Sequence, residues 1–351
     1  MRVLAWPASS EKNAYMSLLY DSMKPFGVEV SDFSTQAMAE GRFSLKDYDL
    51  WHIHWPDHHF NTRNPFKTAK ANSTVLGWFR EAKASGVKLV WTVHNLRPHE
   101  KYHPYLEPFF YRSYTKLLDG WIALSQIAER DAKEKFAPLR EMPAFVIPHG
   151  HYQDAHQSGI SRDEARRQLG LPDSTKVLLN FGLIREYKNI PHLIRMFREL
   201  RGDDYILLIA GLPRSPKLEK EVREAAQGDS RIRLELNFIP DDALPTYFAA
   251  ADLSVLPYKA IMHSGSAVMS LSFNRPVLLP NIGALRELKT YVGDDWVRIF
   301  EGDLSVAELE RSVAWAEHVT GQSADLSELS WDHIGKRTWH AFRDVLAESG
   351  G

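Results

Sequence analysis

The sequence predicts an α/β protein made of two doubly wound, Rossmann-like domains that face each other across a cleft. Its 351 residues exceed the length at which one hydrophobic core usually stops growing. Short apolar, β-rich runs alternate with longer helical patterns, which is typical of parallel βαβ units with helices on both faces of a sheet. The pattern breaks at one polar stretch and then starts again, so we expect two sheets.

Eleven apolar runs are expected as strands, six before the polar stretch and five after it. They are residues 2–6, 28–33, 49–55, 88–94, 121–125 and 144–148, then 176–182, 205–211, 232–238, 253–257 and 276–280. Residues 1–150 are therefore predicted as an N-terminal Rossmann-like domain, 151–173 as a linker, and 174–330 as a C-terminal Rossmann-like domain. Apolar residues at helical spacing predict that 331–351 form a C-terminal helix packing back across the domains.

Composition excludes several classes of function. A formal net charge of −2 argues against a general nucleic-acid binder. The chain contains no cysteine, so disulfides, thiolate metal sites and a cysteine nucleophile are excluded, and a cytoplasmic location is expected. The apolar run at the N-terminus ends at Pro7, too early for a signal peptide, and no apolar stretch is long enough to span a bilayer.

The first candidate binding loop follows the predicted strand 176–182. Gly182 would allow a ligand to approach the backbone, and Arg185 and Lys188 place two cations just before a predicted helix. Asn189 is the predicted N-cap of that helix and Pro191 lies in its first turn. A helix N-terminus also favours anions, so the loop suits a diphosphate. Taken alone, the two cations would be read as solvated loop charges.

The second candidate loop follows the predicted strand 253–257. Ser264, Gly265 and Ser266 open a helix with small residues, so that free backbone N–H groups and two hydroxyls can face phosphate oxygens. Asn274 or Arg275 then turns the chain into the next strand. A lone motif of this kind would be an ordinary N-cap, but its pairing with the loop at 182–188 is more specific.

The paired loops resemble the donor-binding half of GT-B glycosyltransferases. Further stretches are similar to the bacterial exopolysaccharide β-mannosyltransferases, of the xanthan type, which act on a polyprenyl-linked oligosaccharide. These stretches are residues 13–15, 54–57, 92–100, 148–152 and 256–259. The resemblance runs over nearly the whole chain.

The resemblance implies a GT-B fold in which Arg185 and Lys188 contact the diphosphate of a nucleotide sugar, here GDP-mannose. It adds His149, Tyr258 and Lys259 to the donor-binding residues. Retaining members usually carry two glutamates eight positions apart. Alignment on the strand beginning Pro276 places Ile261 and Met269 at those positions. The departure implies an inverting enzyme. No cofactor is expected beyond the donor substrate.

Inverting transfer needs a general base for the acceptor hydroxyl, expected from the N-terminal domain. Asp57, directly after the predicted strand 49–55, is the first candidate and Glu100 is the second. His54 and His94 are expected to bond the sugar or to hold the base. His52, His54, His58 and His59 raise the alternative of a metal site. Because His52 and His54 alternate on a strand and no second ligand cluster exists, we expect no metal.

Two segments are candidates for contact with the anionic cytoplasmic face of the inner membrane. Residues 63–88 carry basic and aromatic side chains together, and residues 102–114 are aromatic. The ordinary alternative is a core-facing helix with a solvated basic side. A lipid-linked acceptor would make such contact useful.

Alternative functions use the same scaffold. One is a UDP-sugar-dependent glucosyl or glucuronosyl transferase, because no residue clearly reads the nucleobase. Another is a non-catalytic nucleotide-sugar-binding subunit of a polysaccharide assembly complex. A nucleotide-sugar 2-epimerase shares the fold type, but no separate sequence feature favours it.

Overall fold

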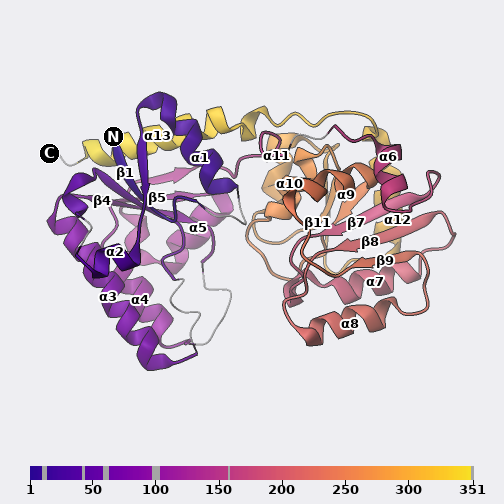
Figure 1. Ribbon diagram of the computed structural model, residues 1–351, viewed down its shortest axis with the longest axis horizontal. Helices are drawn as coiled ribbons and strands as arrows, with labels where there is room; N and C mark the ends of the chain where they lie inside the picture. Colours follow the sequence, from indigo (N-terminus) through magenta and orange to yellow (C-terminus); the bar gives the residue numbers. More distant parts are fainter. Residues whose placement is uncertain (10–13, 42–43, 58–62, 97–102, 157–158, 349–351) are drawn as a thin grey trace. The chain divides into compact units, whose positions relative to one another are not determined.

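The computed structural model describes residues 1–9, 14–41, 44–57, 63–96, 103–156 and 159–348. The chain divides into two compact units, drawn in Figure 1. The first unit contains Met1–Gly150 together with Leu329–Gly351, and the second contains His151–Glu328. Each unit is built on one six-stranded sheet in which every printed pairing is parallel. The predicted fold class of two doubly wound sheets is confirmed.

The first sheet has the strand order β2-β1-β3-β4-β5-β6. Its strands are β1 (Arg2–Trp6), β2 (Glu29–Asp32), β3 (Leu50–Ile53), β4 (Lys88–Val93), β5 (Gly120–Ala123) and β6 (Ala144–Val146). The helices of this unit are α1 (Tyr15–Met23), α2 (Thr35–Ala39), α3 (Pro65–Ala84), α4 (Leu106–Tyr114), α5 (Gln126–Lys135) and α13 (Trp331–Ala347). All six strands predicted for this half of the chain are present.

The second sheet has the order β12-β11-β10-β7-β8-β9. Its strands are β7 (Lys176–Phe181), β8 (Tyr205–Ala210), β9 (Ile232–Glu235), β10 (Leu253–Val255), β11 (Val277–Pro280) and β12 (Val297–Phe300). Its helices are α6 (Arg162–Gln168), α7 (Ile190–Arg198), α8 (Pro216–Ala226), α9 (Leu244–Ala250), α10 (Gly265–Ser272), α11 (Leu288–Val292) and α12 (Val306–Ala316). Sequence analysis missed β12, an edge strand whose apolar run is interrupted by Arg298.

The predicted linker, residues 151–173, belongs to the second unit. Its helix α6 packs on α9, and Arg166 is fully buried where an apolar residue would be expected. The Arg166 guanidinium donates to the Asp252 carboxylate at 2.7 Å and to backbone carbonyls of Asp173 and Thr175 at 2.7 Å each. Because a paired arginine replaces an apolar side chain in this interface, the stretch has the polarity of a linker without being one.

The C-terminal helix is present, and the chain reaches it at residue 329 by returning to the first unit. Figure 1 shows α13, in yellow, running along that unit beside α1. Trp331 lies against Gly150, where an added Cβ would come within 2.5 Å of the indole ring. The sequence had predicted packing across both domains, whereas these contacts complete the core of one.

In each sheet, strands are added first on one side of the starting strand and later on its other side. The chain leaves β7 toward β8 and β9, then returns to β10 on the other side of β7. It likewise passes from β1 to β2 on one side and to β3 on the other. Ligands of doubly wound sheets bind beyond the carboxyl ends of strands at such reversals. The loops after β7 and β10, and those after β1 and β3, are therefore the places to seek a site.

Candidate functional site

In the second unit, the two predicted donor loops converge on the amino group of Lys188. This side chain is 4% exposed, and its Nζ donates to the carbonyl of Phe181 at 3.0 Å and to Ser266 Oγ at 3.5 Å. A Cβ added to Gly182 would lie 3.0 Å from Lys188 Nζ and 3.1 Å from Ser266 Oγ. The loop after β7 and the start of α10 thus form one small polar cradle.

Glycines allow this cradle to close. Gly182 has φ +99°, in the region that favours glycine, and its backbone touches Gly211. A Cβ on Gly211 would come within 2.1 Å of the Gly182 carbonyl oxygen. The loops after β7 and β8 therefore pack backbone to backbone, which leaves no space for a side chain at Gly211.

Burial weakens the charge on Lys188. Removal from water, together with the nearby Arg185 guanidinium, lowers the pKa of Lys188 to about 7. Its Nζ also lies 5.8 Å from the centre of the Tyr258 ring, a geometry that favours the charged form. Arg185 is half-buried beside it. An ammonium that is poorly solvated and surrounded by few acceptors is suited to bind an anionic ligand.

Helix α10 begins at this cradle, with Ser264 as its N-cap. Ser264 Oγ accepts from the Ala267 N–H at 3.1 Å and lies 3.1 Å from the Tyr258 hydroxyl. Its hydroxyl is therefore used inside the protein, unlike the expectation that both serine hydroxyls face a ligand. The N–H groups of Gly265 and Ser266 occupy first-turn positions, which have no intrahelical acceptor. These two amides remain for a ligand, while Ser266 Oγ already accepts from Lys188 Nζ.

The structure places the remaining donor-loop residues at different depths. Tyr258 is buried beneath Lys188, while Lys259 is exposed and its N–H donates to the Tyr187 carbonyl at 2.8 Å. Asn189 stands at the N-cap position of α7, but it is left-handed with φ 57° and makes no side-chain cap, which corrects the predicted role. Asn274, with φ 55°, turns the chain after α10 as expected.

In the first unit, the strand-end histidines belong to a hydrogen-bonded array. The Tyr20 hydroxyl lies 2.8 Å from His52 Nδ1 and 2.7 Å from His54 Nε2. His52 Nε2 lies 2.7 Å from Thr92 Oγ1, and His54 Nδ1 lies 2.9 Å from His94 Nε2. Both ring nitrogens of His54 are thus occupied, and the side chain is 1% exposed. His54 reaches a ligand only through His94.

Burial keeps this array neutral. It lowers the pKa of His52 to about 3 and holds the pKa of His54 well below its ordinary value. At the end of the array the half-buried His94 ring stacks on Trp55, with centroids 4.4 Å apart, and meets the edge of Tyr15 at 5.2 Å. The rings hold His94 at the carboxyl end of β4.

Two other residues predicted for the first-unit site are described by the structure. Asp57 is half-buried after β3. Burial raises the pKa values of Tyr111 and Tyr114, and the charge of Asp57 adds to this effect in both. His149 Nδ1 lies 2.7 Å from the Gly150 carbonyl oxygen, and the His149 ring lies 4.6 Å from that of Tyr15. Glu100 falls outside the described residues.

The described residues contain no group of three or more metal-ligating side chains, and His58 and His59 lie outside them. None of the helices described is both long and apolar enough to cross a bilayer. In the segment 63–88, Phe66 is 84% exposed, while Lys83 and Lys88 pair with Asp119 at 2.8 and 3.3 Å. In the segment 102–114, Tyr105 and Phe109 are exposed.

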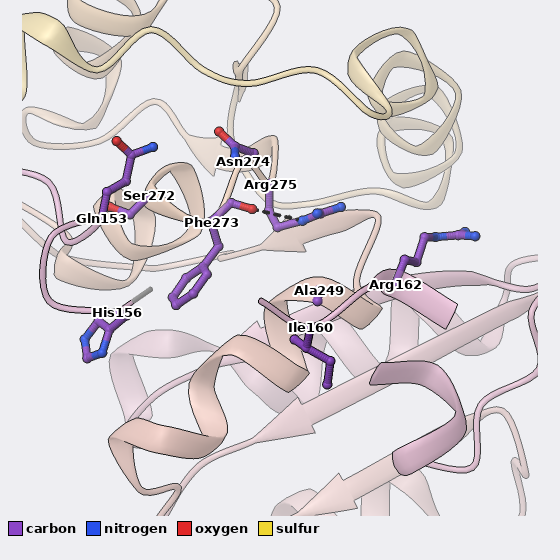
Figure 2. A pocket seen from close by; sticks show the side chains of 9 residues that line it. All are labelled: Gln153, His156, Ile160, Arg162, Ala249, Ser272, Phe273, Asn274 and Arg275. Carbon is purple, nitrogen blue, oxygen red and sulfur yellow. Dashed lines mark hydrogen bonds between the residues drawn. The ribbon is translucent and has the colours of Figure 1, made fainter. Parts of the chain in front are cut away.

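A further pocket of about 490 Å³ lies in the second unit (Figure 2). It is located at the amino ends of β10 and β11, opposite the donor loops. Its two cations are engaged internally, since Arg162 pairs with Asp252 at 2.9 Å and Arg275 donates to the carbonyls of Phe273 and Ala251 at 3.1 Å each. The dashed line of Figure 2 marks the Phe273 bond. These contacts explain the arginines as parts of the scaffold.

Comparisons with known proteins agree with this geometry. The family model "Glycosyl transferases group 1" matches residues 161–318, which include both donor loops. A GDP-mannose:glycolipid 4-beta-D-mannosyltransferase of Xanthomonas campestris pv. campestris is 28% identical over 97% of this chain and 91% of its own. The chain is a glycosyltransferase, and it has the GT-B fold.

Solved structures show the fold of this glycosyltransferase in other proteins. Sucrose-phosphate synthase from Thermosynechococcus elongatus matches with a TM-score of 0.72 and 15% identity, over 99% of both chains. The Anabaena protein HepE in complex with UDP matches with a TM-score of 0.66 and 18% identity, also over 99% of both chains. Both neighbours span the two units.

No role in the first-unit site was predicted for Tyr20, Tyr15 or Thr92. Tyr15 and Thr92 lie in the stretches 13–15 and 92–100 that carry the resemblance, whereas Tyr20 stands at a core position of α1 where no motif marks it. One feature of the sequence does indicate the array. His52 and His54 alternate along β3, which places both on one face of the sheet, where buried imidazoles require partners.

Proposed function

We propose that this glycosyltransferase transfers mannose from GDP-mannose, with inversion, to a polyprenyl-diphosphate-linked oligosaccharide in exopolysaccharide synthesis. The observation that carries the proposal is the similarity to the Xanthomonas mannosyltransferase, which extends over 97% of the chain and so includes both units. The relative's printed name supplies the nucleotide, the sugar and the glycolipid acceptor. We further propose that the protein works on the cytoplasmic face of the inner membrane.

The donor cradle supports this role by its chemistry. Lys188, Arg185, Ser266 and the first amides of α10 together offer a cation pair and neutral donors, which suit the two phosphates of a nucleoside diphosphate. Stabilising the departing diphosphate is the main electrostatic task in glycosyl transfer. In this proposal the cations and amides of the cradle perform that task.

The inverting mechanism is supported by what stands at the two aligned glutamate positions. Ile261 and Met269 are apolar, and Met269 packs against a core cluster of the second unit. Neither side chain can bond the donor sugar as a carboxylate does. A base from the first unit is then required, and Asp57 is our first candidate and Glu100 the second.

The Asp57→Asn substitution tests the base. The amide keeps the shape of the side chain but cannot take a proton, so we expect kcat to fall by about 100-fold or more. GDP binding, measured by titration calorimetry, should remain near that of the wild type. Asp21→Asn is the matched control, because Asp21 is exposed on α1. Wild-type turnover in Asp57→Asn would remove this carboxylate and leave Glu100 to be tested in the same way.

The donor is tested by binding and transfer in parallel. Calorimetric titration with GDP and UDP should favour GDP by about tenfold or more, equivalent to about 1.4 kcal/mol. Transfer of labelled mannose to lipid extracted from a polysaccharide-producing strain should require GDP-mannose. Preference for UDP would favour the glucosyl or glucuronosyl alternative, while nucleotide binding without transfer would favour a non-catalytic subunit.

Membrane contact through residues 63–88 or 102–114 is a further part of the proposal. The exposed Phe66, Tyr105 and Phe109 could enter the interface of a bilayer. Co-sedimentation with anionic vesicles should be reduced in a Phe66→Ser, Phe109→Ser double variant. Equal binding of the double variant would place any membrane contact elsewhere.

A further inference from the structure

Tyr258 lies where the two donor loops meet, and it contacts both of them. It follows β10 and is buried. The amino group of Lys188 lies over its ring, with Nζ 5.8 Å from the ring centre. The hydroxyl of the same side chain lies 3.1 Å from Ser264 Oγ, at the N-cap of α10. A single side chain therefore joins the loop after β7 to the loop after β10.

The surroundings of Lys188 provide little that stabilises a positive charge. Its acceptors are two neutral groups, the Phe181 carbonyl at 3.0 Å and the Ser266 hydroxyl at 3.5 Å. Among the residues that the structure describes, no carboxylate is paired with this amino group. Burial and the nearby Arg185 guanidinium both oppose its charge. The face of the Tyr258 ring favours the ammonium, because the negative face of an aromatic ring attracts a cation within about 6 Å.

The hydroxyl of Tyr258 supports the first turn of α10. Burial raises the pKa of Tyr258 well above its ordinary value, so the hydroxyl is neutral and needs a hydrogen-bond partner. That partner is Ser264, whose Oγ accepts from the Ala267 N–H at 3.1 Å and so caps the helix. The N–H groups of Gly265 and Ser266 belong to this capped turn. The position of the amides that remain for a ligand thus depends on Tyr258.

Burial also keeps Tyr258 away from the donor itself, because its side chain is only 3% exposed. We propose that Tyr258 is a positioning residue of the donor cradle: its ring keeps the Lys188 amino group charged, and its hydroxyl holds the first turn of α10. It acts through these two neighbours and does not touch the nucleotide sugar. The resemblance placed Tyr258 among the donor-binding residues, and the proposal makes its part in that binding indirect. It rests on the proposed function only for the identity of the donor.

The part assigned to the ring is tested on the protein alone. NMR of the full chain with lysine labelled at Cε follows the titration of Lys188, whose signal is identified by its absence in Lys188→Met. We expect Lys188 to titrate about one pH unit lower in Tyr258→Leu than in the wild type, because a buried cation–π contact changes the protonation equilibrium by about tenfold. Tyr258→Phe keeps the ring, so its Lys188 should titrate as in the wild type.

Tyr247→Leu is the matched control, because Tyr247 is a buried tyrosine of α9 that packs in a core cluster of the same unit. It should leave the titration of Lys188 unchanged. Thermal unfolding shows whether each variant is folded. If Tyr258→Leu is unfolded, Tyr258→Met takes its place, since an unbranched methionine fills irregular gaps. An unchanged titration of Lys188 in the folded variant without the ring would overturn the part assigned to the ring.

The part assigned to the hydroxyl is tested by nucleotide binding. Calorimetry uses whichever of GDP and UDP binds the wild type more tightly, and the same nucleotide serves for every variant, so its own ionisation cancels. We expect Tyr258→Phe to bind about two- to tenfold more weakly, by the same factor from pH 6 to 8, because one hydrogen bond is lost and the ring remains. Wild-type affinity in Tyr258→Phe would overturn this part. A loss seen only with the nucleotide sugar would show direct contact and contradict the indirect role.

The outcomes separate the inference from the proposed function. Preference for UDP, or nucleotide binding without transfer of mannose, would contradict the function and leave the role of Tyr258 in the cradle intact. Transfer of mannose from GDP-mannose, by a protein whose Lys188 titrates alike in the wild type and in Tyr258→Leu, would do the reverse.

Discussion

Lys188 and the buried histidines show how position in the fold changes the chemistry of single residues. Lys188 is nearly inaccessible and its pKa is lowered to about 7 by burial, with a smaller effect from Arg185. Burial is also the main reason why the pKa of His52 is lowered to about 3. In both cases burial favours the neutral form of the side chain. Their charge states are therefore properties of the site rather than of the residue type.

The lowered pKa of Lys188 predicts that donor binding weakens in alkali. A bound diphosphate favours the ammonium, so binding above pH 7 must take up a proton, and the dissociation constant of GDP should rise by up to about tenfold per pH unit. Calorimetry in buffers of different ionisation enthalpy measures this proton uptake. In Lys188→Met the dependence should disappear, and in the exposed control Lys217→Met it should persist. A constant affinity from pH 7 to 9 in the wild type would contradict the prediction.

The lowered pKa of His52 predicts loss of stability in acid. The unfolded chain binds a proton near pH 6.5, whereas the folded pKa is about 3, so this contribution is complete above pH 6.5 and is lost as pH falls toward 3. The loss at pH 5 is about 2 kcal/mol, since each pH unit corresponds to about 1.4 kcal/mol. Urea unfolding at pH 7 and 5 should show a smaller pH effect in His52→Gln. The exposed control His318→Gln should keep the full effect.

Close backbone contacts between the loops at the strand ends hold the residues of the donor cradle in place. The loops after β7 and β8 meet at Gly182 and Gly211, and the loop after β10 is joined to that after β11 by a 2.9 Å bond from the Ala284 N–H to the Met262 carbonyl. The donor cradle is thus assembled from strand ends that are adjacent in the sheet but distant in sequence. Its geometry depends on glycine, because a side chain at Gly211 would overlap the neighbouring backbone.

Gly211→Ala tests this dependence. The new Cβ would meet the Gly182 carbonyl at 2.1 Å, so the loop that carries Lys188 must move, and we expect GDP affinity to fall by about tenfold or more. Gly228→Ala is the matched control, because its φ of +84° imposes similar backbone strain while the added Cβ meets nothing within 4 Å. Thermal unfolding measures the stability of both. Equal affinity in the two variants would show that the contact does not shape the cradle.

At the scale of the molecule, two separate cores share one chain. The first unit is completed by α13, whose Phe342 and Ile334 are buried among α1 and the sheet. The second has its own clusters on both sides of its sheet, including Leu309 of α12. Because each of these clusters draws its residues from a single unit, each core should respond to mutation by itself.

Crossed core substitutions test this independence. Phe342→Ala should destabilise the first unit by about 3–5 kcal/mol, and Leu309→Ala the second by about 2–5 kcal/mol, because both side chains are fully buried. Hydrogen exchange read by mass spectrometry should show faster exchange only in the unit that carries the change. GDP binding should survive Phe342→Ala. Loss of protection in both units from either substitution would contradict the division.

Local patterns in the sequence were sufficient for the α/β class, for eleven of the twelve strands and for the residues of the donor loops. These features depend on short-range periodicity and on glycine, proline and small residues at strand ends, which one stretch of chain displays by itself. The exception is β12, whose apolar run is interrupted by Arg298. It forms a strand because it pairs with β11.

Tertiary structure alone decided the unit to which 151–173 and 331–351 belong, the capping use of the Ser264 hydroxyl, and the array behind His94. Each depends on partners far along the chain: Arg166 on Asp252, Ser264 on Tyr258 and α10, and His52 on Tyr20 and Thr92. A sequence displays the groups that require hydrogen bonds, but only the packed fold determines which groups satisfy them, because burial excludes water as the alternative partner.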